Sequence, residues 1–258
     1  MPTKGVSRRM KEALPNLIII GAMKSGTTSL HHQLSMHPDV QMSNPKELNF
    51  FHPGFNLGMR VEWYRSHFSA SAQVRGESSP IYSKCTQYAG VPKRMHQCVP
   101  ETRIIYIVRD PLNRIMSHYR HNVICRREER PIEQCFEDLD SNPYIDASSY
   151  HLQLTAFLEY FRMKQIHVLS TESLAKAPKD ALARVFRFLD IDESPARAIP
   201  PQMRNRTADL RSERGFPPNA PDIHSWSQDL KDRVLERIAP DTCALRTLTG
   251  MRFEGWRI

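Results

Sequence analysis

Residues 16–30, NLIIIGAMKSGTTSL, contain an apolar run, a glycine-bounded loop and the start of a predicted helix. The run Leu17–Ile20 has no polar alternation, which is typical of a strand buried in a parallel sheet. A strand that leads through such a loop into a helix brings backbone N–H groups to the helix N-terminus, where they attract anions. The stretch therefore predicts a phosphate-binding loop in an α/β fold.

The loop differs in one position from the phosphate loop of kinases. Gly21 and Gly26 have the spacing of the G-x-x-x-x-G-K-[ST] motif, but Thr27 stands where that motif has its lysine. The cation of this loop is Lys24, which precedes the second glycine. The loop alone leaves open which kind of phosphate it holds.

A second strand is predicted at Arg103–Val108, and it leads into Arg109, Asp110 and Pro111. Asp before Pro is a favourable start of a helix, with Asp as the N-cap. One hypothesis is a phosphoryl-transfer enzyme, which would need Mg²⁺ and an acidic residue after this strand. The other is a site for a nucleotide with two separate phosphates. The loop would hold one phosphate, and Arg109 and Ser117, about two turns along the helix, would hold the other.

Strands and helices alternate along the rest of the chain, which predicts a single α/β domain with a central parallel sheet flanked by helices. We expect residues 1–15 to be a flexible basic N-terminus and residues 16–258 to form the domain. The expected strands are 17–20, 40–42, 73–78, 103–108 and 165–170. The expected helices are 27–36, 82–98 with a break at Pro92, 111–123, 148–163, 181–189 and 229–238, with a long loop over 200–221.

Composition limits the classes of function. The chain has 258 residues, a net charge of +8 and a pI near 9.4. We therefore expect an anionic partner, which is a nucleotide, an acidic polysaccharide or a nucleic acid. A nucleic-acid binder would need a longer basic stripe with interleaved aromatic residues, and the sequence has none. No apolar run in the sequence is long enough to cross a membrane.

The cysteines indicate a reducing compartment. The five cysteines are scattered, and no Cys/His cluster has the spacing of metal ligands. The first fifteen residues lack the apolar centre of a secretory signal. We expect reduced thiols, no metal site and a cytoplasmic location.

Two motifs together resemble those of the sulfotransferases that use 3′-phosphoadenosine 5′-phosphosulfate (PAPS). They are GAMKSGTTSL at residues 21–30 and RDPLNRIMSHY at residues 109–119, each after a predicted strand. The resemblance implies a P-loop-like fold, adenosine 3′,5′-bisphosphate (PAP) as the product, and no required metal. It places the 5′-phosphosulfate on Lys24, Ser25, Gly26, Thr27, Thr28 and Ser29, and the 3′-phosphate on Arg109 and Ser117.

Further segments resemble the heparan sulfate 3-O- and N-sulfotransferase branch: HPDV at 37–40, KELNFF at 46–51, GESSPIY at 76–82 and NRT at 205–207. This resemblance implies that Glu47 is the general base for a hydroxyl or amino group of a carbohydrate. The chain departs from the branch at Ser78, where the branch has lysine, and at Asn49, where it has histidine. It also lacks the C-terminal disulfide hairpin of the branch, because Cys243 is the lone cysteine of that half.

We therefore expect a sulfotransferase that moves a sulfuryl group from PAPS to its acceptor without a metal. Lys24 would stabilise charge on the leaving oxygen, and Glu47 would take the acceptor's proton. The alternative enzyme is a P-loop kinase. The non-enzymatic alternative is a nucleotide- or polyanion-binding module.

Several side chains have two candidate roles. Glu47 is either the base or only pairs with Lys46 or another surface cation. Glu77 either orients the acceptor or forms a structural ion pair. The resemblance also makes Arg211 and Arg214 candidates for closing over the nucleotide.

Overall fold

The computed structural model describes residues 14–55, 58–201, 221–222 and 226–258. Its centre is a five-stranded sheet in the order β2-β3-β1-β4-β5, with all neighbouring strands parallel. The strands are β1 (Leu17–Gly21), β2 (Val40–Met42), β3 (Val74–Ser78), β4 (Arg103–Val108) and β5 (Ile166–Ser170). The predicted α/β domain with a central parallel sheet is confirmed, and each strand was predicted to within one residue at either end. The expected flexible N-terminus falls mostly on residues outside the described ranges.

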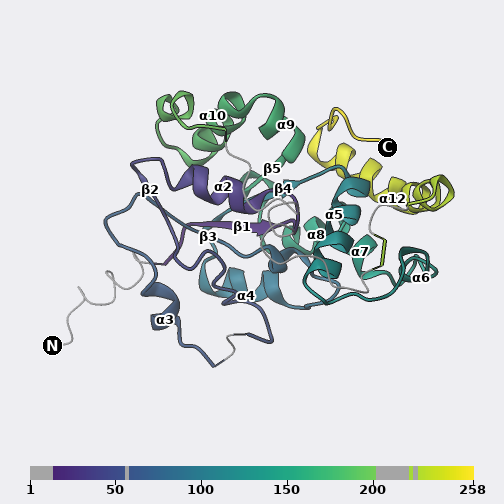
Figure 1. The fold of residues 1–258 in the computed structure, drawn as a ribbon. Coiled ribbons are helices and arrows are strands. Elements are labelled where there is room, and N and C mark those ends of the chain that lie inside the picture. Colours follow the sequence, from purple (N-terminus) through teal and green to yellow (C-terminus); the bar gives the residue numbers. More distant parts are fainter. Residues whose placement is uncertain (1–13, 56–57, 202–220, 223–225) are drawn as a thin grey trace.

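Helices flank the sheet on both faces (Figure 1). Helices α2, α9 and α10 pack on one face, while α4 and α8 pack on the other. The helices are α2 (Thr27–Leu34), α3 (Val61–Arg65), α4 (Val91–Cys98), α5 (Pro111–Ile124), α6 (Ile132–Cys135), α7 (Pro143–Asp146), α8 (Tyr150–Leu158), α9 (Thr171–Lys176), α10 (Pro178–Leu189) and α12 (Gln228–Thr249). Short 3₁₀ turns are η1 (Pro80–Ser83), η2 (Met163–Gln165) and η3 (Ser194–Arg197).

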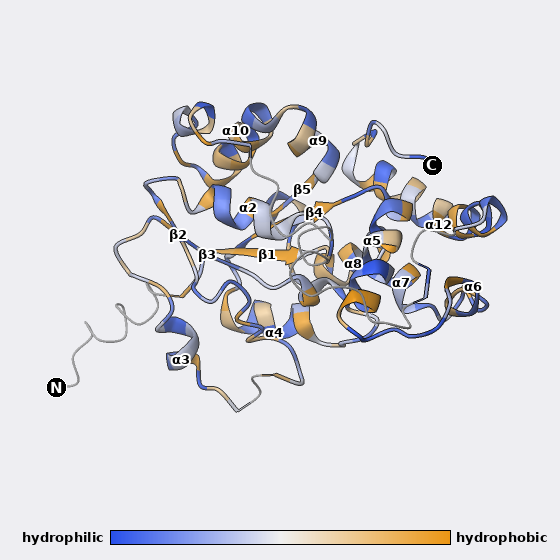
Figure 2. Ribbon diagram, in the orientation of Figure 1, coloured by the Kyte–Doolittle hydropathy of each residue, from blue (hydrophilic) through white to orange (hydrophobic). Residues whose placement is uncertain are grey.

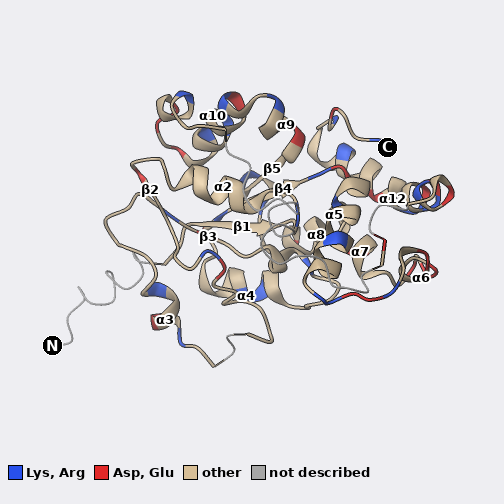
Figure 3. Ribbon diagram, in the orientation of Figure 1, with Lys and Arg blue, Asp and Glu red and all other residues tan. Residues whose placement is uncertain are grey.

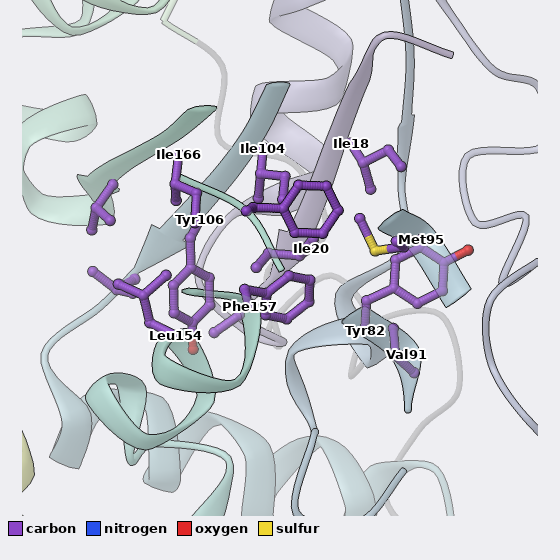
Figure 4. Close-up of a cluster of buried hydrophobic side chains, with 14 of the residues drawn as sticks. Ile18, Ile20, Tyr82, Val91, Met95, Ile104, Tyr106, Leu154, Phe157 and Ile166 are labelled. Carbon is purple, nitrogen blue, oxygen red and sulfur yellow. The ribbon is translucent and has the colours of Figure 1, made fainter. Parts of the chain in front are cut away.

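Strand β1 is buried along its whole length because it supplies side chains to both layers of the core. Ile18 and Ile20 pack with α4 and α8, whereas Leu17 and Ile19 pack with α2 and α10. Figure 2 shows β1 as a hydrophobic arrow at the centre of the sheet, and Figure 4 shows Ile18 and Ile20 in the same cluster as Phe157 of α8. Burial on both faces explains why the sequence of this strand is apolar without alternation.

The expected helix over 82–98 is wrong in its first half. The chain makes the turn η1 and then a loop before α4 begins after Gly90, which has φ 79°. Pro92 lies in the first turn of α4 and therefore does not break it. A proline is tolerated there because the first N–H groups of a helix have no partner within the helix. Two other helices end earlier than expected, namely 27–36 at Leu34 and 148–163 at Leu158.

Helix α12 runs beyond the predicted end at residue 238 and reaches Thr249 before Gly250 caps it. Pro240 lies inside this helix. The apolar stripe continues on either side of that proline, with Ile238 and Leu245 both buried. Tertiary packing of this stripe therefore outweighs the backbone hydrogen bond lost at Pro240. Within the described ranges, α12 and every other helix falls short of the length or the hydropathy that a membrane span needs.

Candidate functional site

A cavity of about 940 Å³ lies where the chain leaves β1, β4 and β5, at the carboxyl edge of the sheet. Open parallel sheets bind their ligands at this edge. The cavity brings together these predicted site residues: Lys24, Gly26, Thr27, Thr28, Ser29, Glu47, Arg109 and Ser117. The exception is Ser25, which is fully buried and does not line the cavity. The structure therefore assembles the predicted residues in one place, while their individual roles stay predictions.

The phosphate loop joins β1 to α2 through two glycines with positive φ. Gly26 has φ 90° and is the N-cap of α2, a backbone conformation that favours glycine. A Cβ on Gly21 would lie 2.0 Å from Ser83 Oγ, so the loop approaches η1 too closely for any side chain. No acidic residue lies in the first turn of α2, and Figure 3 shows α2 without charged residues. The N–H groups at the start of α2 therefore face no competing carboxylate from their own helix.

Neighbouring elements hold this loop in shape. Thr171 Oγ1, at the start of α9, donates to Ser25 O at 2.6 Å. Ala22 N donates to Ile107 O of β4 at 2.6 Å. The Arg109 guanidinium donates to Lys24 O at 3.3 Å. The loop is therefore fixed by β4 and by the residues that directly follow β4 and β5, which is the preorganisation that an anion site requires.

Lys24 is the cation inside the loop. Its backbone is in the left-handed region with φ 70°, and its Nζ lies 3.5 Å from His121 Nδ1 of α5. Burial, with a smaller contribution from the Arg109 charge, lowers the pKa of Lys24 to about 8. The ammonium is therefore poorly solvated in the cavity, and a bound anion would stabilise its charge.

Helix α5 starts as the sequence predicts. Asp110 is fully buried and caps the helix, since its Oδ1 accepts from Asn113 N at 2.8 Å. Its Oδ2 accepts from Arg257 N at 3.0 Å. Asp110 is thus occupied as a structural cap, and the neighbouring Arg109 and the later Ser117 are the α5-side residues that line the cavity at the predicted positions.

Glu47 lies in the loop between β2 and α3, and its side chain is 49% exposed. Lys46 Nζ donates to Glu47 Oε1 at 2.8 Å and to Thr27 Oγ1 at 3.3 Å. The expected pairing of Glu47 with Lys46 is therefore present, and the carboxylate also lines the cavity. A carboxylate that pairs with Lys46 can still accept a proton, so this pair is compatible with either role of Glu47.

Glu77 has neither of its two expected roles. It is fully buried and accepts hydrogen bonds from Tyr64, Ser79 and Tyr82, and it makes no ion pair among the described residues. Burial raises the pKa of this carboxyl group. Ser79 Oγ in turn accepts from Asn49 N at 3.0 Å. Glu77 therefore fastens the loop that carries Glu47 to the sheet.

Sequence reasoning missed further polar residues that line the cavity: Lys84, His118, His121, Asn122 and Arg127. Burial, with smaller contributions from the Arg114 and Arg127 charges, lowers the pKa of Lys84 to about 8. His118 lies within the second motif, but the resemblance assigns it no role. The other four lie outside both motifs, and no local pattern marks them. Asn205–Thr207, Arg211 and Arg214 fall outside the described residues. Across the part of the chain that is described, no group of three His, Cys, Asp or Glu residues is placed to hold a metal ion.

Comparison with known proteins identifies the family. The family model for the sulfotransferase domain matches residues 14–211, so the chain belongs to the sulfotransferase family. Human heparan sulfate glucosamine 3-O-sulfotransferase 5 is 30% identical over 217 residues, which cover 80% of this chain and 59% of that protein. Bifunctional heparan sulfate N-deacetylase/N-sulfotransferase 1 of Caenorhabditis elegans is 31% identical over 201 residues, 72% of this chain and 23% of that protein. The chain thus spans less than two thirds of either relative.

Solved structures agree with this family. A sulfotransferase from Alicyclobacillus acidocaldarius has a TM-score of 0.74 and 25% identity, over 95% of this chain and 99% of that chain. A mouse sulfotransferase complexed with PAP shares the fold, with a TM-score of 0.50 and 16% identity over 96% and 95% of the two chains. The predicted resemblance and the P-loop-like fold are confirmed, and the kinase alternative is not favoured.

Proposed function

We propose that this chain transfers a sulfuryl group from PAPS to a hydroxyl or amino group of a carbohydrate. The observation that carries the proposal is one cavity that contains the phosphate loop, Arg109, Ser117 and a half-exposed carboxylate at Glu47. Family membership supports the reaction class. The names of the relatives, which act on heparan sulfate, support a carbohydrate acceptor.

The donor would bind at two anion sites. The α2 N-terminus and Lys24 would hold the 5′-phosphosulfate, because N–H groups and an ammonium there are already oriented. Arg109 and Ser117 would hold the 3′-phosphate. Among the described residues, six cations line the cavity, namely Lys24, Lys46, Lys84, Arg109, Arg120 and Arg127, with Glu47 as the acidic residue of that lining. This imbalance suits a nucleotide with several negative charges.

The reaction would be an in-line displacement at sulfur. The acceptor oxygen or nitrogen forms a bond to sulfur while the bond from sulfur to the 5′-phosphate oxygen breaks, and PAP leaves. Glu47 takes the proton that the acceptor loses, a contribution of roughly 10²–10⁴ in rate. Lys24 stabilises the charge that grows on the departing oxygen.

We also propose a cytoplasmic location for the domain. None of the five cysteines, all of which lie in the described ranges, forms a disulfide bond, which fits a reducing compartment.

Isothermal titration calorimetry tests the donor. The wild-type chain is expected to bind PAP without Mg²⁺ and to bind ATP much more weakly. Arg109→Ala is expected to weaken the binding of PAP by about 10–100-fold, since a hydrogen bond to a charged group contributes about 1.5–3 kcal/mol. Adenosine 5′-phosphosulfate lacks the 3′-phosphate, so its affinity is expected to change by less than about threefold.

Other outcomes separate the alternatives. Tight Mg²⁺-dependent binding of ATP without binding of PAP would establish a kinase-like site. Binding of PAP, with no transfer of labelled sulfate to any member of a panel of carbohydrates, would favour the non-catalytic module. Equal weakening of both nucleotides by Arg109→Ala would remove the 3′-phosphate role from Arg109.

A further inference from the structure

Lys46 is the side chain that connects the phosphate loop to Glu47. Its Nζ donates to Thr27 Oγ1, in the first turn of α2, and to Glu47 Oε1. The Lys46 carbonyl is held in turn, since it accepts from Ser78 N at 3.1 Å and from Ser43 Oγ at 3.2 Å. The backbone of Lys46 is therefore fixed to β3, while its ammonium reaches across to the loop.

This contact differs from an ordinary surface ion pair. The Lys46 side chain is 18% exposed, whereas both members of the Lys176–Glu254 pair are more than three-quarters exposed. An exposed pair contributes little because water screens both charges. A mostly buried ammonium depends on its partners, so a new anion beside Thr27 would compete with Glu47 for Lys46.

Of the described charged groups around the Lys46 ammonium, only one is a partner that Lys46 can exchange for a ligand. Burial lowers the pKa of Lys46 below its ordinary value, while Glu47 and, more weakly, Glu77 oppose this shift. Glu77 is already bonded to Tyr64, Ser79 and Tyr82. His31 of α2 has a pKa lowered to about 4 by burial and by Lys46, so it is neutral near pH 7 and does not repel the ammonium. Glu47 is thus the partner that Lys46 can exchange.

We propose that Lys46 is a donor-responsive cation, which pairs with Glu47 before PAPS binds and moves its ammonium to the sulfuryl oxygens when PAPS binds next to Thr27. The inference rests on the proposed sulfuryl transfer and adds to it. The exchange would free the Glu47 carboxylate as a base only when there is a group to transfer. PAP lacks the sulfuryl group and would leave the Lys46–Glu47 pair intact.

The exchange fits the reaction without any further reactant. Lys46 keeps its proton throughout and only changes its hydrogen-bond acceptor. Glu47 accepts the proton of the acceptor group, the new bond forms at sulfur, and PAP leaves with the electron pair of the broken bond. Once the sulfated product and PAP have left, Glu47 loses its proton to water and the pair forms again.

A double-mutant cycle on nucleotide affinity tests the exchange, with calorimetry of PAPS and PAP in the absence of an acceptor. The four proteins are wild type, Glu47→Gln, Lys46→Met and the double variant. In the wild-type background PAPS must break the Lys46–Glu47 pair. Glu47→Gln is therefore expected to raise the affinity for PAPS by roughly 3–10-fold. PAP is expected to change by less than about twofold.

The Lys46→Met background isolates the role of the ammonium. Glu47→Gln still removes a negative charge near the sulfuryl group there, so some gain in PAPS affinity remains. The gain is expected to be at least about threefold smaller than in the wild-type background, since no ammonium is released. Lys46→Arg is expected to retain the larger gain. Lys176→Met, which breaks the exposed pair between Lys176 of α9 and Glu254, is the matched control and is expected to leave both affinities unchanged.

The results separate this inference from the proposed function. If PAPS and PAP both bind and the Glu47→Gln gain is the same with and without Lys46, the exchange does not occur. If Glu47→Gln tightens PAP as much as PAPS, the response is not specific to the sulfuryl group and the exchange is again excluded. If neither nucleotide binds the folded wild-type chain, the sulfotransferase proposal itself fails, and the inference fails with it.

Discussion

The position of Lys24 within its loop determines which groups act on it. It precedes Gly26, so its ammonium extends toward α5, where His121 Nδ1 lies 3.5 Å away. A lysine that followed the second glycine would belong to the first turn of α2 instead. The Arg109 charge also lowers the pKa of Lys24. At this position the Lys24 ammonium can act both in the phosphate loop and beside the residues that follow β4.

The lowered pKa of Lys24 predicts how nucleotide affinity depends on pH. A bound phosphate favours the protonated lysine, so above the free-state pKa of about 8 the protein must take up a proton to bind. We expect the affinity for PAP to be flat between about pH 6.5 and 7.5 and to fall by up to about tenfold per pH unit above 8. Calorimetry in a pH series measures this slope.

Lys84 provides the control for the pH series, because burial lowers its pKa to about 8 as well. Lys24→Met is expected to weaken PAP and to flatten the alkaline slope. Lys84→Met is expected to keep the slope. A slope that persists in Lys24→Met and disappears in Lys84→Met would assign the linked proton to Lys84.

Glu47 gives a second prediction at this scale. Glu47→Gln keeps the shape of the side chain but cannot accept a proton, so we expect kcat to fall about 10²–10⁴-fold. Affinity for PAP is expected to stay within about twofold. Steady-state transfer of labelled sulfate and PAP calorimetry measure the two effects, and Glu254→Gln, from the exposed pair with Lys176, is the control. Full activity in Glu47→Gln would show that another group takes the proton.

At the scale of elements, the sequence predicted what local patterns encode. The uninterrupted run Leu17–Ile20 and the Asp110-Pro111 helix start both correspond to the observed structure. The loop before α4 was missed because Gly90, with its positive φ, sets the start of that helix, and helical spacing does not reveal this. The role of Glu77 was missed because its partner Tyr64 comes from α3, across a contact that no sequence pattern records.

The cap of α5 supports a prediction about this element. Asp110→Ala removes the acceptors of Asn113 N and Arg257 N, so we expect a loss of about 1–3 kcal/mol in the free energy of unfolding. Asp110→Asn keeps one side-chain oxygen for the cap and is expected to lose less than half as much. Urea denaturation measures both. Sulfuryl transfer by Asp110→Asn is expected to persist, whereas its complete loss in a well-folded protein would give Asp110 a role beyond the cap.

At the scale of the whole molecule, the site is assembled from segments far apart in the chain. The carboxylate of Glu172, at the start of α9, accepts from Asp110 N at 3.0 Å through one oxygen. Through the other it accepts from Trp256 Nε1 at 3.0 Å. The Glu172 carboxylate thus connects three segments of the chain next to Arg109. They are the start of α9, the N-cap of α5 and the C-terminal segment that carries Trp256. The sequence motifs identified the residues that line the cavity. The contacts that hold those residues in place join distant parts of the chain, and only the folded structure shows them.

This support predicts energetic coupling between Trp256 and Glu172. Trp256→Phe keeps a ring to stack on Phe253 but removes the N–H donor, so we expect a loss of about 1–2 kcal/mol in the free energy of unfolding. In the Glu172→Gln background the same change is expected to have a smaller effect, with a coupling energy of roughly 0.5–1.5 kcal/mol by urea denaturation.

Trp226 supplies the matched control for that cycle. Its side chain is also buried, yet its Nε1 has no hydrogen-bond partner among the described residues. Trp226→Phe therefore removes bulk without breaking such a bond, and its effect is expected to be the same in the wild-type and Glu172→Gln backgrounds. Because Glu172 also holds Asp110 N, Trp256→Phe is expected to weaken PAP by up to about threefold, and Trp226→Phe is not. If the effects of Trp256→Phe and Glu172→Gln on stability are additive and the affinity for PAP is unchanged, the Trp256–Glu172 hydrogen bond does not stabilise the site next to Arg109.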